Sequence, residues 1–135
     1  MRFKIKLVFI LLISSFIFSD SIKFNNPNNH GVIGLINIPT ARFYEESSSA
    51  FTVYRGDPDR KITITMMPYD WLEASVFYTS IKDRPYGGGF DQDYKDKGFN
   101  AKFRLKSEGY FPAIAIGFND LAGTGIYSSE YIVGS

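Results

Sequence analysis

The sequence contains no cysteine. This absence excludes disulfide bonds, a thiolate zinc site, a cysteine nucleophile and a lipid-modified N-terminal cysteine. An excess of charge of one sign is also missing, because 15 Lys and Arg residues stand against 14 Asp and Glu residues, for a formal net charge of +1. The overall charge therefore gives no reason to expect an anionic partner surface, and we expect no nucleic-acid partner.

Side-chain sets for catalysis or metal binding are equally scarce. The single histidine, His30, has no serine and carboxylate spaced around it as a hydrolytic triad requires. Asp91, Asp93 and Asp96 lie close together, but a calcium loop of the EF-hand type needs a glycine where Asp96 stands and a glutamate where Lys102 stands. We therefore expect no catalytic residue, no metal site and no cofactor.

Two further patterns have simpler interpretations. Gly123-Thr124-Gly125 would suit a phosphate-binding turn only if a helix followed, whereas the next residues alternate as a strand does. We expect a hairpin loop there. Glu73, Glu108 and Glu130 could pair as general acid and base, but solvated or lumen-facing carboxylates are the simpler account.

Residues 1–20 have the pattern of a secretory signal peptide. Three basic residues precede an apolar run at 7–18, and the small residues Ser19 and Ser21 follow. A transmembrane helix requires roughly 20 apolar residues, which is longer than this run. We therefore expect export, with the cleavage site left open.

Beyond the asparagine-rich residues 22–30, expected to be flexible, the two-residue period of β-strands dominates. The segment GFNAKFRLK at 98–106 alternates strictly between apolar and polar side chains. Strands are expected at 50–55, 60–67, 71–80, 98–106, 111–119 and from about 125 onward.

The predicted connections alternate in length. Tight turns are expected at 68–70 and 107–110, and longer loops at 81–96 and 119–124. This pattern favours an all-β fold in which an antiparallel meander of about five or six strands forms part of an outer-membrane β-barrel. A soluble antiparallel sheet with one wet face is the alternative. The predicted organisation is a signal peptide at 1–20, an Asn- and Gly-rich leader with the segment GLINIPTAR at 21–49, and a partial barrel domain at 50–135.

Lys102, Arg104 and Lys106 lie on one side of the predicted strand 98–106. In a barrel this side faces the lumen, where the three residues could contact an anionic glycan. The other interpretation is that barrel lumens are polar in general and that some of their residues are basic. Both interpretations stay open.

Several motifs together resemble one family. The chain contains KDKG at 95–98, KFRL at 102–105, FPAIAIG at 111–117 and DLAGTGIYSSEY at 120–131, after GLINIPTAR and MPYDWLEASVFYT. This combination resembles the YjbH-type outer-membrane proteins linked to exopolysaccharide production. The resemblance implies a non-enzymatic outer-membrane β-barrel that acts in export or assembly of an exopolysaccharide. Its implied partners are outer-membrane lipid, the exopolysaccharide and other export proteins, and it transfers no catalytic residue.

Members of that family are several times longer, and a closed single-chain bacterial barrel needs at least about 8 strands. We therefore expect an N-terminal fragment, with a truncated gene product or closure by oligomerisation as alternatives. The alternative function is that of a soluble periplasmic β-domain that binds a glycan or a partner protein.

Overall fold

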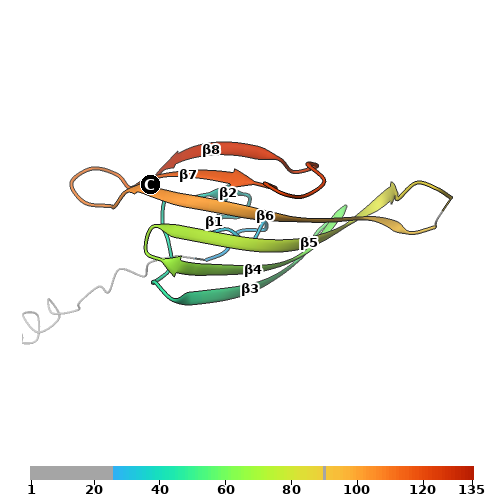
Figure 1. Ribbon diagram of the computed structural model, residues 1–135, viewed down its shortest axis with the longest axis horizontal. Helices are drawn as coiled ribbons and strands as arrows, with labels where there is room; N and C mark the ends of the chain where they lie inside the picture. Colours follow the sequence, from blue (N-terminus) through green and yellow to red (C-terminus); the bar gives the residue numbers. More distant parts are fainter. Residues whose placement is uncertain (1–25, 90) are drawn as a thin grey trace, which may run out of the picture.

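The computed structural model describes residues 26–89 and 91–135, whose regular elements are all β-strands. Six strands form one antiparallel sheet in chain order (Figure 1). They are β3 Ser48–Arg55, β4 Asp59–Tyr69, β5 Leu72–Pro85, β6 Asp93–Lys106, β7 Ile114–Asn119 and β8 Ser129–Gly134. The predicted all-β antiparallel meander is therefore confirmed. A closed barrel is not seen, because β3 and β8 lie at the two edges and do not pair with each other.

The two faces of the sheet differ in polarity. Because successive side chains of a strand point to opposite faces, β4 places Thr63 and Thr65 on one face and Ile62 and Ile64 on the other. The threonines are at most 1% exposed, whereas the isoleucines are 46% and 49% exposed. The polar face is thus covered and the apolar face is open, which is the reverse of a soluble sheet with one wet face.

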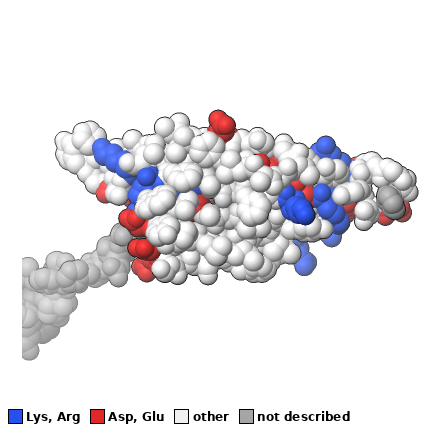
Figure 2. All heavy atoms as spheres, viewed as in Figure 1, with Lys and Arg blue, Asp and Glu red and all other residues white. Residues whose placement is uncertain are grey.

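The open face forms a band with few charged residues. Figure 2 shows charged side chains gathered at the two ends of the molecule and few of them across its middle. We call this surface the apolar band, and its exposed members are Phe51, Val53, Ile62, Ile64, Met66, Val76, Tyr78, Phe99, Leu105 and Ile132.

Residues 26–47, which we call the covering segment, lie against the polar face. Within them, the short strands β1 Gly34–Leu35 and β2 Ile38–Pro39 form a hairpin. Gly31 has a φ of 78°, and a Cβ atom there would lie 2.3 Å from Cγ2 of Thr63, so only glycine allows the backbone this close to β4. The Gly31 carbonyl also accepts a hydrogen bond from the Thr65 hydroxyl.

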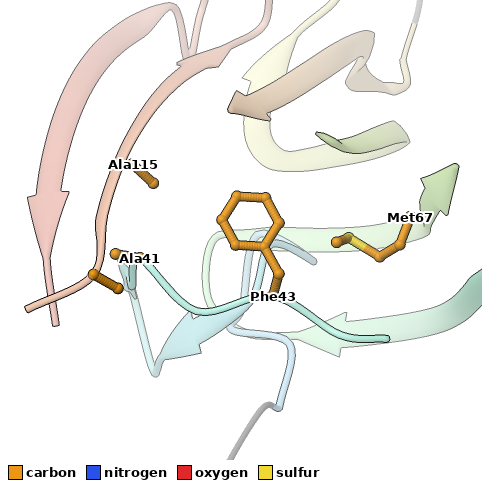
Figure 3. Packing of buried hydrophobic residues seen from close by; sticks show 5 residues of the cluster. Ala41, Phe43, Met67 and Ala115 are labelled. Carbon is orange, nitrogen blue, oxygen red and sulfur yellow. The ribbon is translucent and has the colours of Figure 1, made fainter. Parts of the chain in front are cut away.

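A small apolar core joins the covering segment to the sheet (Figure 3). Phe43 of the segment packs with Met67 of β4 and with Ala41, Ala113 and Ala115. The three alanines contribute little volume, which leaves room for the Phe43 ring between the segment and the sheet.

The strand ends differ from those predicted. β5 continues to Pro85 and β6 starts at Asp93, so the loop expected at 81–96 is reduced to 86–92. β7 starts at Ile114, so the turn expected at 107–110 extends over 107–113. These two connections have the same length, and the predicted alternation of short turns and long loops is not found. The loop was predicted because the side chains beyond the apolar band are polar. The backbones of β5 and β6 nevertheless stay paired as far as Pro85 and Asp93.

The predicted flexible leader also differs in its described part. Asn28 is buried, and its side-chain oxygen accepts the backbone N–H groups of His30 at 2.9 Å and Val32 at 3.1 Å. Asparagine side chains stabilise turns in this way, so residues 26–30 are folded. The expected signal peptide at 1–20 lies outside the described residues. The described part of the chain contains no helix with the length and apolar character needed to cross a membrane.

Candidate functional site

An ion pair lies on the covered face of the sheet, beside the Phe43 ring. Glu73 of β5 and Lys102 of β6 are direct partners in the register of the two strands, so their side chains leave the sheet side by side. Oε2 of Glu73 lies 2.9 Å from Nζ of Lys102, and the two side chains are 2% and 1% exposed. The other carboxylate oxygen, Oε1, accepts the backbone N–H of Ile33 at 3.2 Å. The covering segment therefore supplies a hydrogen bond to the carboxylate of this ion pair.

The Lys102 ammonium group also holds the segment directly. Nζ donates to the backbone carbonyls of Arg42 at 2.9 Å, Thr40 at 3.2 Å and Ile33 at 3.4 Å. It lies 4.5 Å from the centroid of the Phe43 ring. An ammonium group has three donors and no acceptor, so these carbonyls and the Glu73 carboxylate satisfy all of them. Burial of the charge is tolerated because the segment supplies these acceptors.

A cavity of about 320 Å³ lies between the covering segment and the sheet, towards the end that carries the connections 56–58, 86–92 and 120–128. We call this end the loop end. The walls of the cavity combine amides, aromatic rings and two basic groups, supplied by Asn28, Asn37, Asn100, Asn119, Phe77, Tyr127, Tyr131, His30 and Lys61. Such a mixture of apolar surface with a few polar groups is typical of ligand pockets.

Lys61 of β4 is the buried cation of this cavity, with 4% exposure. Its Nζ lies 3.2 Å from Nδ1 of His30 and 4.8 Å and 4.4 Å from the ring centroids of Phe77 and Tyr127. Among the described residues no carboxylate forms an ion pair with it. Because an ammonium group only donates, Nδ1 of His30 is the acceptor and the ring is neutral.

The titration of His30 follows from this position. Burial lowers the pKa of His30 below its ordinary value of 6.5, the charge of Lys61 lowers it further, and Asp59 acts weakly in the opposite direction. The imidazole therefore stays neutral in the folded chain at a pH where an exposed histidine takes up a proton.

The loop at 120–128 contains the glycine motif and shapes one wall of the cavity. Asp120 is buried, its N–H donates to the Asn100 side chain at 3.1 Å, and its Oδ2 accepts the N–H of Tyr127 at 3.3 Å. A Cβ atom on Gly123 would lie 1.8 Å from Oδ1 of Asp120, so glycine is required for this close packing. The Thr124 hydroxyl donates to Asp96 at 2.6 Å. The motif connects β7 and β8, as predicted for a hairpin loop, and it positions Tyr127.

Burial and the Asp59 carboxylate both raise the pKa of Tyr127, whose hydroxyl donates to Oδ2 of Asp59 at 2.5 Å. The Tyr127 hydroxyl therefore stays protonated, and the hydrogen bond fixes the ring at the cavity wall.

The three predicted glycan-facing residues have different surroundings. Lys102 is covered, as described above. Arg104 lies 3.7 Å from Asp70 and over the Phe43 ring at 4.5 Å, and Lys106 lies over the Phe111 ring at 4.3 Å. In this structure Arg104 and Lys106 retain surface for a ligand, and their contact with a glycan stays a prediction.

Sequence reasoning missed the roles of Glu73, His30 and Lys61. Glu73 is a buried ion-pair partner on the covered side of the sheet rather than a solvated group. The available signal was a carboxylate and an ammonium group on the polar sides of neighbouring strands. The described residues contain no group of three or more His, Cys, Asp or Glu side chains able to hold a metal ion.

We expect Lys102→Met to destabilise the folded chain by about 3–5 kcal/mol, because it leaves the Glu73 carboxylate buried without its cation. Urea unfolding of the chain folded in detergent measures this cost. The double variant Glu73→Gln with Lys102→Met is the control and should recover much of the loss. A cost below about 1 kcal/mol for the single variant would contradict this account.

We expect the covering segment to detach more readily in mild acid. Unfolded His30 binds a proton near about pH 6.5 and the folded form only at lower pH. The contact therefore contributes stability above that pH, and this stability is lost as the pH falls. Proteolysis within residues 26–47 should be faster at about pH 5.5 than at about pH 7.5, a window above the titration of ordinary carboxylates. In His30→Gln the difference between the proteolysis rates at the two pH values should shrink. An unchanged difference would mean that other groups cause the pH dependence.

Comparison with known proteins agrees with the motifs. The family model described as exopolysaccharide biosynthesis protein YbjH matches residues 26–135. The chain is 35% identical over 113 residues to a protein of Escherichia coli (strain K12) called uncharacterized lipoprotein YjbH, a match that covers 80% of this chain and 16% of the relative. No solved structure matches the chain. The chain belongs to the YjbH family of exopolysaccharide biosynthesis proteins.

Proposed function

We propose that the six-stranded sheet is part of an outer-membrane β-barrel that serves export or assembly of an exopolysaccharide, without enzymatic activity. The observation that carries this proposal is the reversed polarity of the sheet, with a largely apolar band outside and a polar, covered face inside. Transmembrane barrels have this arrangement because their outer side chains contact lipid and their inner side chains contact water or a plug.

Aromatic residues at one end of the sheet support a membrane position. Tyr69 and Trp71 stack with their centroids 5.4 Å apart, and Phe103 lies 6.2 Å from Trp71, at the end opposite the loop end. At the loop end, Tyr94 pairs with the buried Ile81 and lies on the side of the covered face, so it does not belong to this aromatic group. Aromatic girdles of this kind flank the apolar zone of outer-membrane barrels, where the rings meet the lipid headgroups.

The name of the relative suggests a different way of attachment to the membrane. The Escherichia coli protein is called a lipoprotein, whereas this chain contains no cysteine to carry a lipid. The apolar band gives an alternative way of holding the chain in the envelope. The edge strands β3 and β8 each have an unpaired side, and unpaired backbone groups are very costly in lipid. A barrel therefore needs further strands at both edges.

We expect Ile64→Arg to separate a membrane position from a soluble one. Ile64 lies in the middle of the apolar band, where it pairs with Phe51 and Val76. In a lipid-facing position arginine should cost about 2–4 kcal/mol and reduce the amount of chain recovered in the outer-membrane fraction. Tyr110→Arg is the matched control, because Tyr110 is 98% exposed in the connection 107–113. Equal recovery of both variants would contradict the barrel.

We also expect Arg104 and Lys106 to assist an acidic polymer. The double variant Arg104→Gln with Lys106→Gln should lower secretion of an acidic exopolysaccharide by a few-fold through the lost attraction. The amount of chain in the membrane should not change, because both side chains are only partly buried or exposed. Secretion is measured as polymer released per cell, and a neutral polymer is the control. Unchanged secretion would remove this role from the two residues.

A soluble periplasmic β-domain that binds a glycan or a partner protein is the second candidate. It is favoured by one observation, which is that the described strands do not close into a barrel. Recovery of the mature chain from the periplasm without detergent would select it over the barrel.

A further inference from the structure

We propose that the cavity beside Lys61 binds one neutral pyranose unit of a polysaccharide. This inference rests on the proposed function, because it names the sugar class that the covered face recognises. The cavity of about 320 Å³ is separate from the Glu73–Lys102 contacts that hold the covering segment.

The polar groups of the walls suit sugar hydroxyls. A hydroxyl both donates and accepts hydrogen bonds, and so do the side chains of asparagine and tyrosine. Two of the wall groups, Oδ1 of Asn119 and the Tyr131 hydroxyl, are buried without a hydrogen-bond partner among the described residues. Buried polar atoms of this kind are uncommon in folded proteins, and a ligand with neighbouring hydroxyls offers both a donor and an acceptor.

The aromatic groups suit the other surface of a sugar ring. Tyr127 and Tyr131 line the cavity from the connection 120–128 and from β8. The C–H groups of a pyranose form an apolar face with a slight positive charge, and an aromatic ring presents a negative face to such a surface. Tyr127 is held in place by its hydrogen bonds to Asp59 and Asp120, so the ring is positioned before a ligand arrives.

The charges around the cavity favour a neutral unit over an acidic one. Lys61 carries the positive charge, but the carboxylates of Asp59, Asp96 and Asp120 all act on it electrostatically. His30, the other basic group of the lining, is neutral. A uronate would bring a further negative charge into a site whose cation is already balanced. A single ring also fits the volume, which is at the lower end of the range of ligand pockets.

The test uses the full chain folded in a detergent without a sugar headgroup, because such headgroups would compete. Glucose, galactose and mannose are compared with glucuronate and galacturonate, and binding is followed by saturation-transfer NMR with a titration for the Kd. We expect at least one neutral sugar to bind saturably and more tightly than its matching uronate. No saturable binding, or tighter binding of the uronate, would overturn the inference.

Two variants locate the binding. Tyr131→Phe removes only the unpartnered hydroxyl, so it should weaken binding about three- to tenfold while the urea midpoint stays equal or rises. Tyr127→Leu removes the ring and should weaken binding more than about tenfold. Tyr78→Leu, on the apolar band, is the control and should leave binding unchanged. If Tyr127→Leu fails to fold, Tyr131→Phe alone decides, and unaltered binding in that variant would contradict the site.

Failure of this inference and failure of the proposed function give different results. A chain that assembles in the outer membrane and supports export, but binds no neutral sugar, removes the sugar site alone. A chain that binds glucose or another neutral sugar in the cavity, yet is recovered as a soluble periplasmic protein, removes the barrel and keeps the site.

Discussion

The buried ammonium group of Lys102 is the constraint on which the rest of the structure depends. Its charge lies on the face of the sheet that would otherwise meet water, and its partners come from both the sheet and the covering segment. The Glu73 carboxylate supplies the opposite charge, and the three carbonyls supply hydrogen-bond acceptors for its three donors. The sheet and the segment therefore form one unit, although the segment contributes only two short strands.

This constraint explains why the polarity of the sheet can be reversed. A sheet in a soluble protein is stabilised by an apolar face turned inwards. Here the inward face is stabilised by hydrogen bonds and charge pairing, with a small apolar core around Phe43 at one end. The apolar side chains are left for the outside, where lipid rather than protein would cover them under the proposed function. The same polar interior leaves room for the amide-lined cavity.

The sequence predicted the strands because alternation is a strong local signal. Thr63, Ile64 and Thr65 alternate so regularly that both the strand and its two faces follow from the pattern. The lengths of the strands were less predictable. Pro85 and Asp93 are partners at the ends of β5 and β6, although their residue types are typical of loops.

The covering segment and the cavity were harder to predict from the sequence. The glycines and asparagines of residues 26–40 suggest loops, and their order comes from contacts with strands far along the chain. The His30–Lys61 contact joins residues 31 positions apart and Lys102–Arg42 joins residues 60 positions apart. No periodic pattern within one segment encodes such pairs. The glycines of the loop at 120–128 predicted a hairpin bend, but not its contacts with Asp96 and Asn100.

The position of the covering segment sets an order for the folding of the chain. Every strand pair of the sheet joins neighbours in the sequence, so the hairpins need only short loop closures. The segment instead contacts β4, β5 and β6, and its Ala41 N–H donates to Ser135, 94 residues away. Contacts of such separation carry a larger loop-closure cost, so we expect them to form after the strands have paired. On this expectation, the polar face stays hydrated while the hairpins assemble and is covered when the segment docks.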